Sequence, residues 1–177
     1  MKGIITFSLW GGDPKYTVGL AKNLELAPLV YPDWKVICFV GKSTVSTSVI
    51  ENLDKYPCEI RIMNEDAGIH GAFWRFLPIF EVFDPIPLIV RDADSRLSLR
   101  EKIEVDKWLS SGKSVHSIKD HPNHYQFPLM AGMCGFKLGK NKFSYYEMLN
   151  YAYKHYYLND QHWLSNSIYP AVKNDIF

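Results

Sequence analysis

The chain has 177 residues, which fits a single domain with a hydrophobic core of its own. Hydrophobic residues make up 47% of the chain and aromatic residues 15%, a composition that excludes intrinsic disorder. The formal net charge is +1 and Lys and Arg form no run, so the sequence argues against nucleic acid as a partner. No apolar run is long enough for a transmembrane segment or a signal peptide, and we expect a cytoplasmic protein.

The cysteines fit the same location. Cys38, Cys58 and Cys134 are an odd number, and each lies in a mostly apolar stretch. We expect them to be reduced thiols that pack in the interior, not disulfides or metal ligands.

The N-terminal third predicts strands that alternate with helices. Residues 3–10 read as a strand, which Gly11-Gly12 ends. Asp13 caps the next helix, which ends near Pro32, and its predicted buried face is Tyr16, Leu20, Leu24 and Ala27. A strand over residues 36–40, a helix that Ser43 caps and Pro57 ends, and a half-exposed strand over residues 58–62 follow.

This β-α-β-α-β order predicts a parallel, right-handed nucleotide-binding half. Gly11-Gly12 is not a Gly-X-Gly-X-X-Gly fingerprint, so a dinucleotide is not indicated. The strand end formed by Ser8, Leu9 and Trp10 could hold a nucleotide base through its backbone groups. The alternative for Trp10 is an aromatic residue that only packs at a strand end.

Residues 68–83 predict a helix that Pro78 kinks or splits in two. Its expected buried face is Ile69, Phe73, Phe76, Phe80 and Phe83. Arg75 falls on the flank of that face. It could make a surface salt bridge, or its guanidinium could reach a diphosphate or sugar.

A short apolar strand over residues 88–90 runs directly into Arg91-Asp92-Ala93-Asp94. Side chains on extended chain alternate with period two, so the Asp92 and Asp94 carboxylates should point the same way. The C-terminal end of such a strand is where open α/β sheets hold ligands, and two carboxylates there could hold Mg²⁺ or Mn²⁺. A solvated turn, with Asp92 as a cap or paired with Arg91 or Arg96, is the alternative.

The C-terminal part adds further elements with polar connections. We expect helices over residues 99–110 and 143–157, strands over residues 114–118 and 130–136, and a last helix that Asn159 caps. His121 and His124 have no third ligand at a recognisable spacing, so zinc is not indicated. The tyrosines of residues 143–157 are expected mainly in packing, although tyrosines also stack on sugar rings.

The ordered series of motifs resembles the GT-A class of nucleotide-sugar glycosyltransferases with an Asp-X-Asp motif. The series in this chain consists of residues 91–96, Asp120-His121-Pro122, residues 132–135, and Asp160-Gln161 followed by Leu164, Ile168 and Pro170. The closest resemblance is to small enzymes encoded in bacterial polysaccharide loci and by large DNA viruses. It implies an α/β fold with a mostly parallel, Rossmann-like twisted sheet flanked by helices, in which residues 1–95 bind the nucleotide sugar and residues 96–177 face the acceptor.

The resemblance also implies roles for individual residues. Asp92 and Asp94 match the metal and donor motif, with Arg91 and Ala93 beside them. Arg75 matches a basic residue that faces the donor, and Ser8 to Trp10 match the edge that binds the base. Asp160 matches the acidic residue facing the acceptor and would be the general base of an inverting reaction. The residues expected on the acceptor side are Asp120, His121, Gly132 and Met133.

The implied activity is metal-dependent transfer of a sugar, from a nucleoside diphosphate sugar such as a UDP-hexose to a hydroxyl of a glycan or lipid-linked acceptor. Mn²⁺ or Mg²⁺ is the implied cofactor. Many such enzymes supply a further metal ligand, often His, beyond the last helix, and no His follows Pro170 here. Asp92, Asp94, phosphate and water would then hold the metal alone, unless a ligand lies in a tail that this sequence lacks.

Three alternatives remain open at this stage. A domain that binds a nucleotide sugar without turning it over would show the same motifs. A nucleotidyltransferase would also use a nucleotide at this sheet edge. A phosphohydrolase of the haloacid dehalogenase type is less well supported, because its Asp pair normally follows the first strand and here three strands come before it.

Overall fold

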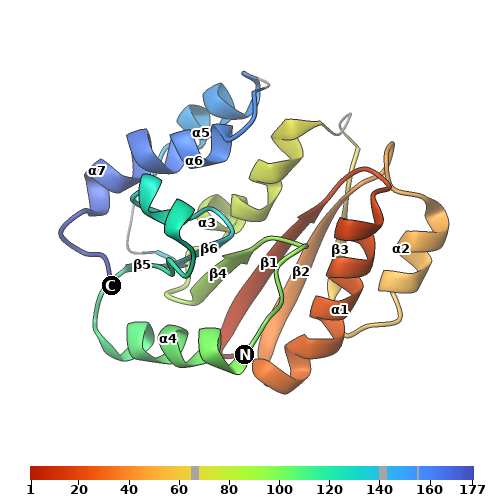
Figure 1. Cartoon of the computed structure of the whole chain (residues 1–177), viewed down its shortest axis with the longest axis horizontal. Coiled ribbons are helices and arrows are strands. Elements are labelled where there is room, and N and C mark those ends of the chain that lie inside the picture. Colours follow the sequence, from red (N-terminus) through yellow and green to blue (C-terminus); the bar gives the residue numbers. More distant parts are fainter. Residues whose placement is uncertain (65–67, 140–142, 155) are drawn as a thin grey trace.

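The computed structural model describes residues 1–64, 68–139, 143–154 and 156–177, which form an α/β fold around one six-stranded sheet (Figure 1). The strand order is β3-β2-β1-β4-β6-β5. The strands are β1 (Gly3–Leu9), β2 (Trp34–Gly41), β3 (Glu59–Met63), β4 (Pro87–Arg91), β5 (Val115–Ser117) and β6 (Met133–Lys137).

The sheet is mostly parallel, as the sequence predicts. Strands β3, β2, β1 and β4 run parallel, with Thr6 of β1 opposite Ile37 of β2 on one side and Val90 of β4 on the other. Strand β6 runs antiparallel to β4, and β5 runs antiparallel to β6. The carboxyl ends of β1 and β4 therefore meet at one edge of the sheet, beside the start of β6.

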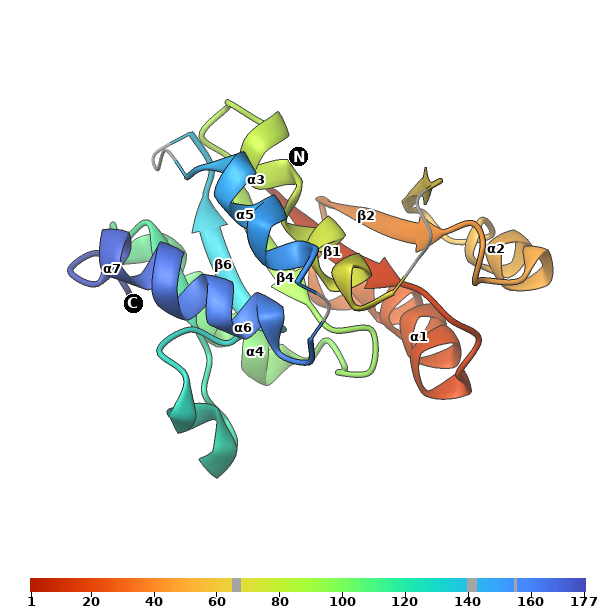
Figure 2. The same ribbon diagram turned by 90° about the horizontal axis from the view of Figure 1, so that it is seen from above.

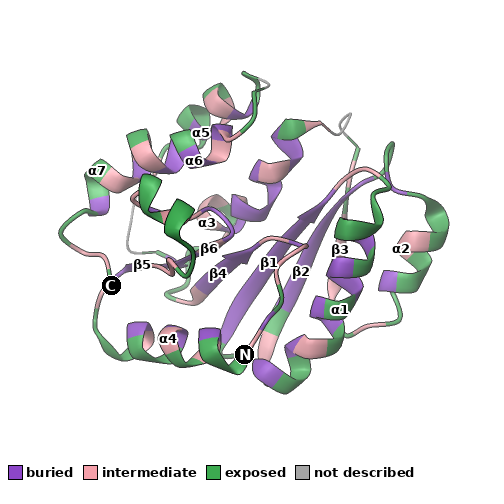
Figure 3. Cartoon of the chain, viewed as in Figure 1, coloured by how far each residue is buried: buried purple, intermediate pink, exposed green. Residues whose placement is uncertain are grey.

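Helices cover both faces of the sheet (Figures 1 and 2). Helices α1 (Pro14–Val30), α2 (Thr47–Leu53) and α4 (Leu99–Ser110) pack on one face, around Phe7, Cys38 and Ile89. On the other face, around Phe39, Leu88 and Phe136, lie the 3₁₀ helix η1 (Ile69–Phe76), α3 (Pro78–Glu81), α5 (Tyr145–Ala152), α6 (Asn159–Trp163), the π-helical turn η3 (Leu164–Ile168) and α7 (Tyr169–Val172). Figure 3 shows the resulting burial, with the central strands buried and the outer helix faces exposed.

Helix α1 follows its sequence signals at both ends. The Asp13 carboxylate accepts a hydrogen bond from the backbone N–H of Lys15 at 2.8 Å, and Pro14 occupies the first helical position. Leu20 and Leu24 are buried against the sheet. Tyr16 was predicted on the same buried face but is 38% exposed, because the first turn of α1 extends to the sheet edge.

The predicted helix over residues 68–83 is split in two, as Pro78 indicated. Its first half is the 3₁₀ helix η1 and not an α-helix, and Pro78 begins the short helix α3. Phe73 and Phe76 of the predicted buried face are buried, but Ile69 is 38% exposed and Phe83 is 83% exposed. The tighter winding of a 3₁₀ helix rotates side chains away from α-helical positions, and Phe83 lies beyond α3 altogether.

Several other boundaries differ from the sequence-based expectation. Ser46, not Ser43, caps α2 through its side chain, and Leu158 precedes α6 in place of Asn159. Helix α5 ends at Ala152, short of the predicted residues 143–157, of which residue 155 lies outside the described residues. In helix α4, Val105 and Trp108 are buried, whereas Ile103 is 54% exposed. None of the described helices is both long enough and apolar enough to cross a membrane.

Candidate functional site

A pocket of about 310 Å³ opens at the sheet edge where β1 and β4 end. Its walls come from both layers of helices, namely from the first turn of α1, from η1 and from the start of α6. The lining side chains come from Trp10, Lys15, Tyr16, Ile69, Ala72, Arg75, Asp92, Asp94, Met130, Ala131, Gly132, Tyr157, Leu158, Asp160 and Gln161. Three carboxylates and two cations thus converge in one pocket.

Arg75 connects two of the carboxylates. Its Nη1 donates a hydrogen bond to Oδ1 of Asp92, and its Nη2 donates one to Oδ2 of Asp160 at 2.8 Å. The Arg75 side chain is only 6% exposed, whereas that of Asp92 is 42% exposed and that of Asp160 is 13% exposed. Burial lowers the pKa of Arg75, but the two carboxylates outweigh burial and raise it, so the guanidinium stays charged.

The backbone of η1 fixes the position of Arg75. The backbone N–H of Arg75 donates a hydrogen bond to the Ser8 hydroxyl at 2.9 Å, and Ser8 belongs to the central strand β1. Gly71 of the same 3₁₀ helix lies against the Trp10 ring, where a Cβ would be 3.1 Å from the ring atoms. The helix therefore lies close to the end of β1, and the hydrogen bond to Ser8 fixes its position relative to the sheet.

Asp92 lies against the backbone at the entrance to β6. A Cβ placed on Gly132 would overlap the Asp92 carboxylate, so only glycine leaves room for this side chain. Glycine at such a position is typical of close approach by another group. The group that approaches is the carboxylate of Asp92.

Asp94 pairs with the other helical layer. Its Oδ2 lies 2.7 Å from Nζ of Lys15 in the first turn of α1, and its side chain is 25% exposed. Lys15 is itself 60% exposed, and the hydrogen bond and charge of Asp94 raise its pKa. An exposed lysine on a flexible stem can move away from the carboxylate when a ligand competes for it.

The start of α6 is fixed by a residue in the left-handed region. Leu158 has a φ of 66°, a conformation that redirects the chain into the helix. The Oδ1 of Asp160 accepts a hydrogen bond from the backbone N–H of Gln161 at 2.9 Å. The Gln161 side chain accepts from the N–H of Ala131 at 2.7 Å and donates to the carbonyl of Leu129 at 3.3 Å. Gln161 thereby joins α6 to the segment that leads into β6.

The donor set of the pocket fits a hard divalent cation bound together with a phosphate. Asp92 and Asp94 both offer carboxylate oxygens to the same pocket, and carboxylate oxygens are the ligands that Mg²⁺ and Mn²⁺ prefer. No cluster of three or more His, Cys, Asp or Glu side chains arranged for a metal occurs among the residues that the structure describes. Two carboxylates alone would leave the other ligand positions of such a cation to a substrate and water.

The structure brings together six of the residues that the sequence singled out, namely Trp10, Arg75, Asp92, Asp94, Gly132 and Asp160. It does not bring Ser8 and Leu9 into the pocket by their side chains, which are 5% and 1% exposed. Arg75 is not a surface residue.

Arg91 is placed elsewhere. Its side chain is 1% exposed and turns to the α4 side of the sheet, where Nε donates to Glu101 at 2.7 Å and Nη1 donates to the carbonyl of Cys134 at 2.9 Å. Adjacent residues at a strand end point to opposite faces, so Arg91 and Asp92 cannot serve the same ligand with their side chains. The expectation that the Arg91 side chain binds the donor therefore has no support in this geometry.

The remaining predicted residues also lie outside the pocket. Ala93 is 4% exposed in the core beside α1. Asp120 pairs with Arg100 at 2.9 Å, and Asp120 and Met133 line a separate groove along α4. The His121 ring accepts a hydrogen bond from the N–H of Asn123 and caps the short 3₁₀ helix η2 (Pro122–Gln126), which Figure 2 shows standing away from the sheet.

Sequence reasoning did not predict the other nine lining residues as part of a site, among them Lys15, Tyr16, Tyr157 and Gln161. A signal existed for Lys15 and Tyr16, since the first turn of a helix after β1 must lie at the sheet edge. Gln161 adjoins Asp160 in the sequence. Tyr157 gave no local signal that set it apart from its neighbouring tyrosines.

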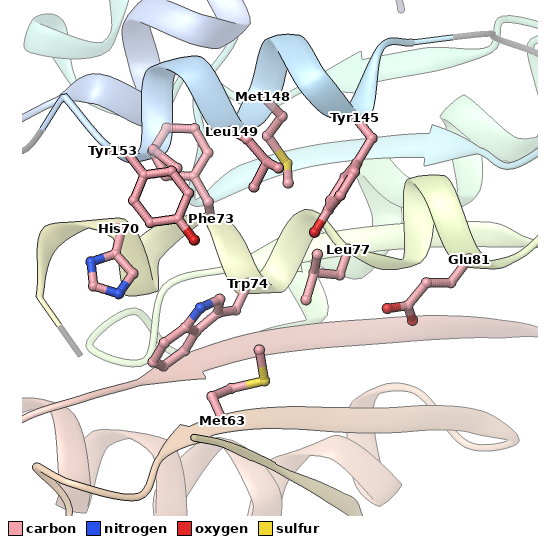
Figure 4. A pocket seen from close by; sticks show the side chains of 11 residues that line it. Met63, His70, Phe73, Trp74, Leu77, Glu81, Tyr145, Met148, Leu149 and Tyr153 are labelled. Carbon is pink, nitrogen blue, oxygen red and sulfur yellow. The ribbon is translucent and has the colours of Figure 1, made fainter. Parts of the chain in front are cut away.

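A second pocket, of about 130 Å³, lies on the other side of η1 (Figure 4). One wall of this pocket is formed by His70 and Trp74 of η1 and by Leu77 directly after it. The facing wall includes Met148 of α5 and Tyr153, which follows α5. The His70 ring stacks on the Tyr153 ring at 5.8 Å. Helix η1 thus separates an aromatic pocket from the charged pocket that holds Arg75.

The comparisons with known proteins show the fold. The chain resembles the mannosyltransferase PcManGT from Pyrobaculum calidifontis, whose structure contains GDP-Man and Mn²⁺, with a TM-score of 0.56, 13% identity and 77% of this chain covered. The chain spans only 44% of the length of that protein. It also resembles the galactosyltransferase LgtC in complex with donor and acceptor sugar analogues, with a TM-score of 0.53 and 11% identity over 98% of this chain and 72% of that one. The fold is GT-A-like.

Cytidylyltransferases share the same architecture. One from Leptospira borgpetersenii has a TM-score of 0.57 and 13% identity over 99% of this chain and 72% of its own. No family model and no curated protein sequence matches the chain. The structural neighbours are thus transferases of two kinds, glycosyltransferases and nucleotidyltransferases.

Proposed function

We propose that the protein is a glycosyltransferase that moves a sugar from a nucleoside diphosphate sugar to a hydroxyl group. The observation that carries this proposal is the Arg75 guanidinium, which connects Asp92 of the Asp-X-Asp motif to Asp160 across the pocket. These residues come from β4, η1 and α6, and they meet at the sheet edge where α/β folds hold nucleotides. The GT-A-like fold and its glycosyltransferase neighbours support the same function.

The donor would lie along the pocket from α1 to η1. Trp10 offers an aromatic ring for the base at the end of β1, and Lys15 offers a charge to the diphosphate. Asp92 and Asp94 would hold Mn²⁺ or Mg²⁺ against the diphosphate. Such a cation, when bound, offsets the negative charge that the diphosphate gains as it leaves.

The sugar would lie against the hydrogen-bonded pair of Arg75 and Asp160. Arg75 presents donors in a rigid plane, and its two carboxylate partners hold that plane in place. The Asp160 carboxylate is fixed by Arg75 on one oxygen and by the Gln161 N–H on the other. In an inverting reaction, Asp160 would accept the proton of the acceptor hydroxyl as that oxygen bonds to the sugar.

Calorimetry with UDP and GDP, in Mn²⁺ or in EDTA, tests the donor site. We expect binding in Mn²⁺, much weaker binding in EDTA, and loss of the metal-dependent part in Asp94→Asn. Asp106→Asn on the exposed side of α4 is a matched control, since it removes a carboxylate far from the pocket. Equal affinity with and without metal would contradict the role of the Asp pair.

Nucleotidyl transfer is the second candidate, because cytidylyltransferases share the fold. Such an enzyme must hold the triphosphate of its nucleotide substrate. Of the two cations among the described residues of this pocket, the buried Arg75 is held by two carboxylates, which leaves only the exposed Lys15 for the phosphates. Incubation with CTP and with UDP- and GDP-sugars separates the candidates, since release of pyrophosphate indicates nucleotidyl transfer and release of UDP or GDP indicates sugar transfer. Donor binding with no release of either would indicate a binding domain.

A further inference from the structure

Exposed apolar side chains gather at the mouth of the charged pocket. Ile69 of η1 is 38% exposed, and Tyr157 before α6 is 79% exposed. Both line the pocket that also contains Asp160. They come from parts of the chain far apart in sequence, so their convergence is not a consequence of local structure. Exposed apolar and aromatic side chains that converge on one pocket with a few polar groups have the composition of a ligand-binding site.

These two residues lie on one side of the pocket. Lys15, Asp94 and the first turn of α1 belong to the face of the sheet covered by α1. Helices η1 and α6, which border Ile69 and Tyr157, pack on the opposite face. The hydrogen bond between Arg75 and Asp160 connects η1 to α6. A donor whose diphosphate lies at Asp94 and Lys15 would therefore leave the side at Ile69 and Tyr157 open.

We propose that Ile69 and Tyr157 form the acceptor subsite, and that the acceptor group bound there is a saccharide ring. This proposal rests on the proposed function and assigns it an acceptor class. Asp160 is three residues from Tyr157 and faces the same pocket, so a ring held by Tyr157 would have its hydroxyl groups near the carboxylate that accepts the proton.

The chemistry of the lining favours a saccharide over a lipid chain. A pyranose ring has an apolar face of C–H groups and a polar rim of hydroxyls. Tyr157 and Ile69 suit the apolar face, and the Asp160 carboxylate suits the hydroxyls. An alkyl chain would have to lie against the buried charges of Arg75 and Asp160, where it would remove their hydration and offer no hydrogen bond in return.

The predicted acceptor side at Asp120 and His121 is less well placed. Neither lines the pocket of Asp160, and His121 is exposed beyond the α4 groove. Met133 lines that groove as well. The subsite at Ile69 and Tyr157 replaces this expectation with residues that share a pocket with Asp160.

Saturation-transfer NMR tests the subsite without requiring turnover. The probes are methyl β-galactoside, methyl α-mannoside, methyl β-glucoside and lactose, each with UDP and Mn²⁺ present. We expect at least one saccharide to bind the wild type, and Tyr157→Ala to weaken it by about threefold to tenfold, the range of an aromatic contact. Tyr157→Trp, which keeps an aromatic face, should retain binding.

Tyr146→Ala is the matched control, since Tyr146 is 76% exposed on α5 and does not line the pocket. Binding of no saccharide by the wild type, or equal binding by wild type and Tyr157→Ala, would overturn the subsite. Equal loss in Tyr146→Ala would also overturn it. UDP affinity, measured on the same samples, keeps the two proposals apart. Loss of saccharide with UDP binding intact supports the subsite, whereas absence of metal-dependent binding of both UDP and GDP in the wild type contradicts the proposed function.

Discussion

The Nη2 atom of Arg75 lies 2.8 Å from Oδ2 of Asp160, although the two residues are 85 positions apart in the chain. The same guanidinium bonds Asp92, so one buried cation fixes two carboxylates from two different elements. This arrangement determines how the pocket responds to substitution, because both carboxylates lose a hydrogen bond when the guanidinium is removed.

Arg75→Lys should therefore separate geometry from charge. A lysine keeps the positive charge but cannot donate from a rigid fork to both carboxylates. We expect sugar transfer to fall by roughly 10²-fold, which corresponds to the loss of a charge-assisted hydrogen bond of about 1.5–3 kcal/mol. Arg75→Ala should also lower the free energy of unfolding, since it leaves the partly buried Asp160 without its cation. Thermal melting and donor turnover measure both effects; normal turnover in the lysine variant would contradict a bidentate role.

Gly132→Ala should displace Asp92. A Cβ at this position overlaps the carboxylate, which must then move away from Arg75 or push the entrance of β6 outward. We expect metal-dependent UDP binding to weaken by about tenfold or more, with a modest loss of stability of about 1–3 kcal/mol from overpacking.

The control for this variant is Gly12→Ala, at the same sheet edge. A Cβ on Gly12 would have no heavy atom within 4 Å. This variant should bind UDP as the wild type does. If Gly132→Ala binds UDP normally too, the contact between Gly132 and Asp92 has no bearing on the donor site.

Glu101→Gln tests the reassignment of Arg91 from ligand binding to the core. Glu101 is 5% exposed and accepts hydrogen bonds from Arg91 at 2.7 Å and from the Tyr31 hydroxyl at 2.8 Å. Glutamine has the same size but leaves the Arg91 charge buried without a counter-charge, which should cost about 3–5 kcal/mol of unfolding free energy. Urea denaturation measures this loss, and UDP affinity should remain unchanged in the folded fraction.

The exposed pair of Lys102 and Asp106 on the same helix provides the comparison. Nζ of Lys102 donates a hydrogen bond to Oδ1 of Asp106 at 2.7 Å, but the Asp106 side chain is 53% exposed. Asp106→Asn should change stability by less than about 1 kcal/mol. Similar losses in the two variants would mean that burial of Glu101 does not determine its contribution.

The thiols should differ in reactivity. A hydrogen bond from the Cys38 thiol lowers the pKa of Cys58, which is only half-buried. Burial raises the pKa of Cys134 to about 12. Because the thiolate is the reactive form, Cys58 should react first with Ellman's reagent, and its rate should level off at a lower pH than that of a model thiol. Cys58→Ser should remove this fast phase, and Cys134→Ser should leave it; a fast phase that survives Cys58→Ser would contradict the assignment.

The sequence predicted those parts of the site that depend on one element at a time. The strand before Asp92, the alternation of side chains along it, and the split at Pro78 all follow from local rules. The alternation does not extend to Asp94, which lies in a turn after β4 and pairs with Lys15 of the opposite helical layer. The same alternation places the Arg91 side chain on the opposite face from Asp92. The prediction that Arg91 binds the donor relied on its being next to Asp92 in the motif and did not take this alternation into account. For the direction of these side chains, the period-two alternation of the strand was thus a better guide than adjacency in the sequence.

Contacts between elements could not be predicted in the same way. The pairing of Lys15 with Asp94 and the contact of Gly132 with Asp92 depend on how α1 and β6 approach the sheet edge. Tyr157 is one of six tyrosines between residues 143 and 157, and only its position before α6 places it in the pocket. Such distinctions arise from tertiary packing, which a single sequence without its fold does not specify.

Asp160→Asn is the substitution that decides whether Asp160 takes part in catalysis. Asparagine has the same shape, and its amide oxygen can still accept the hydrogen bond from Arg75, so the expected change to the pocket is the loss of the one hydrogen bond from the Gln161 N–H. If Asp160 accepts a proton in the transition state, transfer should fall by about 10²–10⁴-fold, the usual contribution of a general base. Donor affinity should change by less than about tenfold, because Asp92 and Asp94 remain.

A purely structural role for Asp160 predicts a different result. The carboxylate lies in the first turn of α6, where a negative charge stabilises a helix by about 0.3–1 kcal/mol, and its pair with Arg75 adds to this. Asp160→Asn would then lower the melting temperature while turnover of the folded protein stayed close to that of the wild type. Turnover, UDP affinity and melting measured on one preparation distinguish the two roles. A loss of transfer with UDP affinity preserved would establish that Asp160 acts on the transfer step itself.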